Sequence, residues 1–374
     1  MWGGAARVAD DMYALRRVVT TSMGRSRAYR SHALAGRNGD RMPASRWRGL
    51  PLVILAFPLV LSRLSPAAAA SDAVGISPHF PKPPALHASV EFWKRMYTEF
   101  GVGDFVLHDR DNLHVIYDVV QVNGTTNGRR AEELAKPEIE RARERYEVIL
   151  VSLARSIPPE ALGIEGRWVD QAWGCPCPPE GLLRAAANIR VQQGVREKVD
   201  EGVQRARRYL PRILPILRRH NVPEELAALP LVESAFNPQA RSRAGAVGLW
   251  QFVAPTGKRY LTITRGRDDR RDPIRATEAA ARLLRHNYET LGSWPLALMA
   301  YHHGMEGVLA ARAAVGSSAV EEIIARYTGP RFGFASKNFY AEYLAALEIF
   351  RPAIREHAQP PPRPTRPSRP IRKG

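Results

Sequence analysis

The chain has 374 residues, of which 45% are hydrophobic, enough for a catalytic domain with a sizeable core and a smaller accompanying region. Its formal charge is +18, which suits anionic surfaces such as cell-wall polymers or the outer face of a membrane. The sequence has neither zinc-finger spacing nor interleaved aromatic and basic residues, so we expect no nucleic acid partner.

Residues 1–70 are typical of an upstream extension followed by a signal peptide. Arg46 and Arg48 precede an apolar run at 50–61, and alanines at 68–70 resemble the end of a cleavable leader. This predicts an exported, periplasmic protein associated with the envelope, and Met42 is an alternative start. A membrane anchor is the other interpretation, although the run is short for a span. Residues 1–70 hold eleven Arg and three Asp, so about +10 remains without them (18 − 8).

Residues 71–219 are predicted to form a small hairpin followed by helices. Alternating apolar side chains over 105–120, with a turn at 109–112, predict the hairpin. Apolar positions at helical spacing predict helices over 139–153 and 199–217, the second kinked or broken by Pro211 and Pro215. Cys175 and Cys177 are too close for an unstrained disulfide and too few for a structural zinc site, so we expect no metal and no cofactor.

Residues 220–350 are predicted to be the catalytic domain, and the chain as a whole to be mainly α. A helix is expected to start near Pro223 and stop at Asn237, with Glu233 in its last turn. Asp272 is expected to cap a helix over 273–291, and two further helices follow. Residues 351–374 are rich in Pro and Arg and are predicted to form a disordered tail.

Glu233 is the candidate acid. Its neighbours Val232, Ala235 and Phe236 are apolar, and the end of a helix is the negative end of its dipole. Both effects favour a carboxyl group that keeps its proton, which glycoside cleavage needs at the leaving oxygen. An ordinary solvated glutamate is the alternative that these residues alone leave open.

Several motifs in order make that alternative less attractive. The Glu233-Ser pair is followed by Ser242-Arg-Ala-Gly-Ala and by Gly248-Leu-Trp-Gln, then by Ala300-Tyr-His-His-Gly and the stretch 338–346. This series closely resembles the active-site segments of the lytic transglycosylases of glycoside hydrolase family 23, which have the goose-type lysozyme-like fold. Within that family the membrane-bound murein transglycosylase D type is the most similar, over roughly 220–350 and more loosely over 90–219.

The resemblance implies a lysozyme-like SLT fold and cleavage of the MurNAc–GlcNAc bond of peptidoglycan with formation of 1,6-anhydroMurNAc ends. Glu233 would act first as acid and then as base. Ser234, Gln251, Tyr301 and Tyr340 would bind substrate, although Gln251 could also tie down a loop and either tyrosine could be a core aromatic.

The sequence also departs from the family. His302 stands where the family usually has Asn, and none of the acids nearest along the chain, at 268, 269 and 272, is securely a second catalytic carboxylate. A lysozyme-type hydrolase and a non-catalytic peptidoglycan-binding scaffold therefore stay open as alternatives. The sequence does not indicate an oligomeric state.

Overall fold

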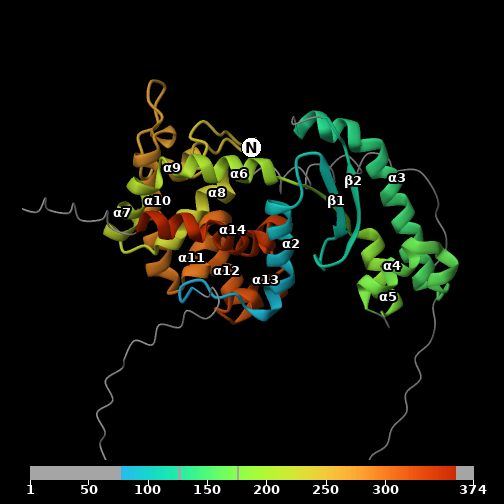
Figure 1. Cartoon of the computed structure of the whole chain (residues 1–374). Coiled ribbons are helices and arrows are strands. Elements are labelled where there is room, and N and C mark those ends of the chain that lie inside the picture. The colour runs from blue at the N-terminus through green and yellow to red at the C-terminus, as the bar shows by residue number, and fades with distance from the viewer. Residues whose placement is uncertain (1–76, 125–127, 175–176, 359–374) are drawn as a thin grey trace, which may run out of the picture. The chain divides into compact units, whose positions relative to one another are not determined.

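The computed structural model describes residues 77–124, 128–174 and 177–358, which all belong to one compact unit (Figure 1). The extension, the expected signal peptide, Cys175 and the end of the tail lie outside the described residues. In chain order the elements are η2 (Pro84–Leu86), α2 (His87–Thr98), β1 (Asp104–Asp109), β2 (Ile116–Gln121), α3 (Gly128–Ala154), η3 (Pro159–Leu162), α4 (Gly163–Trp173), α5 (Pro179–Ala187), β3 (Ile189–Gln193), α6 (Arg196–Ala206), α7 (Leu210–Arg219), η4 (Glu224–Ala228), α8 (Leu229–Ser234), α9 (Ala254–Gly257), η5 (Asp269–Arg271), α10 (Pro273–Leu291), α11 (Trp294–His303), α12 (Met305–Val315), α13 (Val320–Arg326) and α14 (Phe334–Ala358).

The expected hairpin is present, and it belongs to a three-stranded antiparallel sheet of order β2-β1-β3. Phe105 of the central strand pairs with Val120 on one side and with Gln193 on the other. Strand β3 was not predicted from the sequence. The expectation of a mainly helical fold with a small β element is confirmed.

Two hydrophobic cores meet at this sheet because successive side chains of a strand point to opposite faces. Phe105 and Leu107 of β1 pack into the smaller core, which also contains side chains of α3, α4 and α5. Val106, between them, packs into the larger core with α2. In Figure 1 the strands β1 and β2 are drawn between the labels of α2 and α3.

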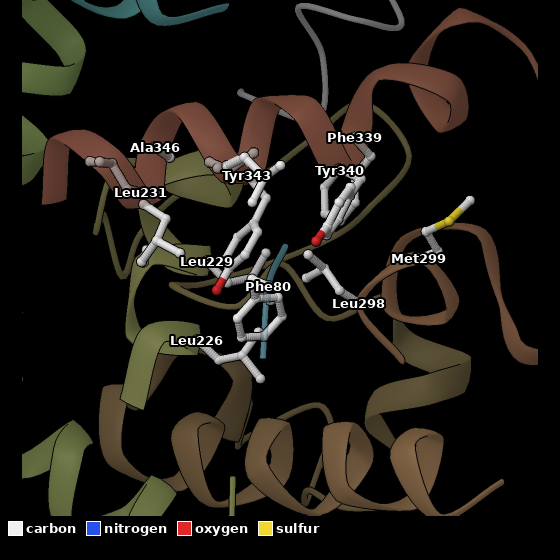
Figure 2. Packing of buried hydrophobic residues seen from close by; sticks show 14 of the residues in the cluster. Phe80, Leu226, Leu229, Leu231, Leu298, Met299, Phe339, Tyr340, Tyr343 and Ala346 are labelled. Carbon is white, nitrogen blue, oxygen red and sulfur yellow. The ribbon is translucent and has the colours of Figure 1, made fainter. Parts of the chain in front are cut away.

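The larger core is built around α14, α11 and the segment η4–α8. Phe80 meets Tyr343 of α14 edge to face, with ring centroids 5.0 Å apart. Figure 2 shows this pair beside Leu226 and Leu229. Packing of α14 against α2, η4, α8 and α11 brings distant parts of the chain to the neighbourhood of Glu233.

Of two proline-containing stretches, the first agrees with expectation and the second differs from it. The helix expected over 199–217 is broken between Ala206 and Leu210, ahead of Pro211, and Pro215 lies within α7. Helix α14 continues through Pro352 to Ala358, so the first residues of the expected tail are helical, and Ile354 among them is buried. The apolar contact of Ile354 with the core accounts for this extension.

None of the described helices combines the length and the apolar character that a membrane span needs.

Candidate active site

Glu233 lies in the last turn of α8, as expected, and only 8% of it is exposed. The helix ends abruptly, because Ala235 and Phe236 both adopt left-handed backbone conformations with φ of 48° and 56°. Residues with side chains rarely adopt this conformation, so the surrounding structure must hold it in place. The carboxyl group of Glu233 is therefore presented from a sharp and fixed turn.

Helix α6 supports this turn from behind. A Cβ atom on Gly202 would lie 2.8 Å from Leu231 Cδ1 and 3.0 Å from Ala235 Cβ, so the two helices approach closely. Arg205 Nε donates a hydrogen bond to the Ala235 carbonyl oxygen at 3.0 Å. These contacts between α6 and α8 hold the strained end of α8 in place.

The loop 240–252 covers the other side of the segment. Ser234 Oγ donates to the carbonyl oxygen of Leu249 at 2.8 Å, and Trp250 Nε1 donates to Thr277 Oγ1 of α10 at 2.9 Å. Tyr301 of α11 donates its hydroxyl proton to the Trp250 carbonyl oxygen at 2.5 Å. Three of these side chains thus clamp the loop to three different helices.

Gln251 has a split role in this loop. Its Nε2 donates to the Gly248 carbonyl oxygen at 2.8 Å, which ties down the loop. Its Oε1 is buried without a hydrogen-bond partner among the described residues, and its φ is 46°. A buried acceptor without a partner is costly, so Gln251 Oε1 is a candidate acceptor for a group that the structure does not contain.

Arg270, which no sequence motif indicated, supports the same loop. Its guanidinium group donates to the carbonyl oxygens of Gly245 and Phe252, each at 3.2 Å, and it pairs with Asp268 at 2.7 Å. Asp272 caps α10 by accepting from the amides of Ile274 and Arg275, which confirms the expected cap. Asp268 and Asp272 are therefore accounted for by structural contacts.

Glu233 acts on a second carboxyl group, and this group comes from a part of the chain where we did not expect it. Burial and the Glu233 carboxylate raise the pKa of Glu342, on α14, to about 8. Burial, then Glu342 and then Glu233 raise the pKa of Tyr97 on α2. Burial and Glu233 also raise the pKa of Tyr301. Two carboxyls and two phenols from four helices thus form one electrostatic cluster.

Two other residues singled out from the sequence lie among aromatic side chains. Tyr340 is fully buried, and its hydroxyl donates to the Pro81 carbonyl oxygen at 2.8 Å, a contact that ties α14 to the segment before η2. His302 stacks on Phe339 with ring centroids 4.1 Å apart. A substrate-binding role for Tyr340 stays a prediction, while its contacts here are those of a packing residue.

The site is thus a buried glutamate at a helix end of a mainly helical domain, beside a loop that is clamped to three helices. The family model described as "Transglycosylase SLT domain" matches residues 215–324. The match includes Glu233, the loop 240–252 and Tyr301.

Curated relatives agree with this assignment. The chain is 35% identical over 165 residues to membrane-bound lytic murein transglycosylase D of Escherichia coli (strain K12), covering 39% of this chain and 36% of the relative. It is 37% identical over 109 residues to a putative tributyltin chloride resistance protein of Alteromonas sp. (strain M-1), covering 29% of this chain and 53% of that protein. Membrane-bound lytic murein transglycosylase C of Actinobacillus pleuropneumoniae serotype 5b (strain L20) is 41% identical over 69 residues, 18% of this chain and 19% of its own length.

The chain therefore spans about a third of the length of the D-type relative and about half of the Alteromonas protein. The resemblance to lytic transglycosylases of the D type is confirmed.

Proposed function

We propose that this protein is a peptidoglycan lytic transglycosylase. It cleaves the MurNAc-β-1,4-GlcNAc bond and leaves a 1,6-anhydroMurNAc end. The observation that carries the proposal is the buried Glu233 at the strained end of α8, inside the matched SLT segment. The catalytic domain would span 220–350 behind the region 71–219, and the protein would act in the periplasm after removal of its leader.

The mechanism follows from one carboxyl group used twice. Glu233, protonated, donates its proton to the glycosidic oxygen as the bond to MurNAc breaks. Glu233, now ionised, takes the proton of the MurNAc C6 hydroxyl, whose oxygen closes on C1. The acetamido group of the substrate would stabilise the cationic centre between these steps. Protons balance, and no water is consumed.

The other site residues would position glycan and loop. Gln251 Oε1 would accept a hydrogen bond from the glycan, while Ser234 and Tyr301 would hold the loop that places Gln251. In this assignment Ser234 and Tyr301 act on the substrate through the loop. Tyr340 would support α14.

The first prediction concerns Glu233. Glu233→Gln keeps the side-chain shape and removes the titrating proton, so turnover of purified peptidoglycan should fall at least about 1,000-fold, within the range for loss of an acid/base group. Glu133→Gln, an exposed glutamate of α3, is the matched control and should keep full activity. Mass spectrometry of the wild-type products should show anhydro-ended muropeptides, lighter by one water than hydrolysis products.

The second candidate function is a lysozyme-type hydrolase, and Glu342 is the observation in its favour. Glycosidases that deliver water use a second carboxylate. Glu342 lies close enough to Glu233 for the Glu233 carboxylate to raise the pKa of Glu342. Reducing-end products from the wild-type protein would establish hydrolysis and refute the transglycosylase. If the wild type and Glu233→Gln bound peptidoglycan equally and neither turned it over, the protein would be a non-catalytic peptidoglycan-binding scaffold.

A further inference from the structure

A basic pocket near the loop 240–252 is a cavity that the mechanism above does not use. Its volume is about 330 Å³, and its lining comes from the segment after α9, from η5 and from α10. A volume of this size lies at the lower end of the range for ligand sites in proteins. The charged and aromatic side chains of the lining are Lys258, Tyr260, Asp269, Arg275, Glu278 and Arg282.

The two carboxylates of the lining are already paired with arginines. Asp269 accepts hydrogen bonds from Arg267 Nε at 2.8 Å and from Arg275 Nη1 at 2.7 Å. Glu278 forms an ion pair with Arg219 of α7. These carboxylates therefore do not balance the other two cations of the lining, and the pocket carries an excess of positive charge.

Lys258 and Arg282 are the two cations without a carboxylate. Lys258 is exposed, and its ammonium group has no hydrogen-bond or ion-pair partner among the described residues. Arg282 Nη2 donates to the Tyr260 carbonyl oxygen at 2.8 Å, and the guanidinium carbon lies 5.5 Å from the centroid of the Tyr260 ring. Because these contacts already orient the guanidinium group, less side-chain freedom is lost when a ligand binds to it.

This chemistry favours an anionic ligand, and a carboxylate in particular. A guanidinium group can donate two parallel hydrogen bonds to one carboxylate, and a lysine adds a mobile point charge. Tyr260 and Leu261 give the lining an apolar part that can contact the chain carrying the carboxylate. A short peptide with free carboxyl groups combines both properties.

The pocket borders the loop that lies beside the candidate acid. Asp269 is followed directly by Arg270, whose guanidinium group donates to two carbonyl oxygens of the loop 240–252. Glu278 is preceded by Thr277, whose hydroxyl oxygen accepts from the indole of that loop. The lysine of the pocket follows α9, which begins two residues after the loop. The pocket and the candidate active site are therefore supported by the same short loop and its neighbours.

We propose that this pocket binds a carboxylate of the peptide stem that MurNAc carries in peptidoglycan. The inference rests on the proposed function and adds to it a preference for glycan strands that bear stems. The stem is attached to the sugar whose bond is cleaved, so its carboxylates arrive with the substrate. Their negative charge is opposite to that of the pocket.

An anionic lipid surface fits the same charge less well. Proteins that lie on a membrane surface insert exposed apolar side chains beside their basic residues. The large apolar side chains that are exposed in the described part of the chain all lie within residues 134–183, whereas the pocket is built from residues 258–282. The pocket therefore offers charge without an apolar group that could enter a bilayer.

The first test compares kcat/KM for glycan fragments that keep their stems with kcat/KM for the same fragments after an amidase has removed the stems. The wild type should prefer the stem-bearing fragments, and the double variant Lys258→Gln/Arg282→Gln should lower this preference about fivefold to tenfold. Lys136→Gln/Arg355→Gln removes the same charge from exposed residues outside the pocket and should keep the wild-type preference. An equal preference in all three proteins would overturn the proposal.

The single variant Lys258→Gln guards against a folding defect in the double variant. The Lys258 ammonium group has no partner to lose among the described residues, so this variant should fold like the wild type. It should lower the preference in the same direction by a smaller factor. A folded Lys258→Gln and a folded double variant that both keep the wild-type preference would refute a role for the pocket.

A binding measurement separates this proposal from the proposed function. Calorimetric titration of Glu233→Gln with a soluble MurNAc-peptide should show binding that weakens as salt rises, that weakens when the peptide carboxyls are amidated, and that weakens again when Lys258→Gln is added. Equal binding of the free and amidated peptides would refute the carboxylate site, even if anhydro products are formed. Binding to phosphatidylglycerol vesicles but not to the peptide would assign the pocket to lipid and refute it as well. Reducing-end products from the wild type would instead refute the transglycosylase and leave the peptide binding intact.

Discussion

Single hydroxyl and carboxyl groups hold the loops around the candidate site in place. Tyr301 and Ser234 each donate their hydroxyl proton to a backbone carbonyl oxygen of the loop 240–252. Asp269 has the same task in the next loop, where it accepts from Arg267 and Arg275 and from the amide of Thr262. These side chains satisfy backbone groups that loops would otherwise leave to water.

Asp269 makes this support dependent on pH. Hydrogen bonds from Arg267, then from Arg275 and from the Thr262 amide, hold the pKa of the Asp269 carboxyl well below its usual range, against the opposing effect of burial. A carboxyl whose pKa is lowered by folding stabilises the folded state above its unfolded pKa of about 4. That contribution is lost as the pH falls from there towards the folded pKa.

We therefore predict that the melting temperature of Asp269→Asn lies below that of the wild type at pH 7, and that the gap narrows progressively below about pH 4. Thermal unfolding followed by circular dichroism between pH 7 and pH 2.5 measures it. Asp200→Asn, at an exposed aspartate of α6, makes the same chemical change and should show almost no gap at any pH. A gap for Asp269→Asn that does not change with pH would contradict the argument.

At the scale of elements, the loop 240–252 depends on a glycine with a left-handed backbone conformation. Gly248 has φ of +83°, and a Cβ atom there would lie 1.8 Å from the Arg270 carbonyl oxygen. Its amide also donates to the Ala240 carbonyl oxygen at 2.9 Å. A side chain at this position must therefore displace either the loop or the backbone of η5.

The loop offers a matched pair of variants. Gly245→Ala meets nothing within 4 Å and has φ of +80°, so it should cost only the backbone strain of about 1 kcal/mol. Gly248→Ala adds the steric clash to similar strain and should cost on the order of 3 kcal/mol or more, with activity lost as Trp250 and Gln251 move. Denaturant unfolding measures both, and equal costs would show that the approach to Arg270 can relax freely.

Elements with local signals were predictable from the sequence, and elements that need distant partners were not. Asp272 and Gly292 mark the two ends of α10 because capping is decided by the chain itself. Strand β3, Ile189–Gln193, carries no hairpin turn, because its partner β1 lies far earlier in the chain. No local rule joins these two segments, and only tertiary packing does.

The residues of the candidate site also fall into those that the sequence could predict and those that it could not. Glu233, Ser234, Gln251 and Tyr301 could be named because they belong to motifs with fixed spacing, and the structure brings all four to α8 and its covering loop. Glu342 belongs to no acid motif and reaches Glu233 only through the packing of α14 on α8. Proximity of this kind is made between helices, and the spacing of residues along the chain does not reveal it.

At the scale of the whole described unit, the sheet joins two cores through a small aromatic contact. His108 of β1 is fully buried, with its ring centroid 4.6 Å from that of Phe92 and 6.0 Å from that of Phe334. Burial lowers its pKa to about 3, so it is neutral at physiological pH. The Arg190 guanidinium of β3 lies 4.0 Å from the centroid of Phe334. Phe334, the first residue of α14, is thus the side chain on which two strands rest.

We predict that Phe334→Ala removes this support and costs about 3–5 kcal/mol of stability, the range for a buried phenylalanine. Because the lost contacts belong to β1 and β3, hydrogen exchange of amides in those strands should accelerate, while amides of α12 should keep their protection. Phe334→Leu retains apolar volume but offers Arg190 no aromatic face, so its cost should be smaller, about 1–2 kcal/mol. If exchange accelerated only in α14, the sheet would be held by other contacts. If it accelerated equally everywhere, the two cores would unfold as one cooperative unit, and Phe334 would stabilise both.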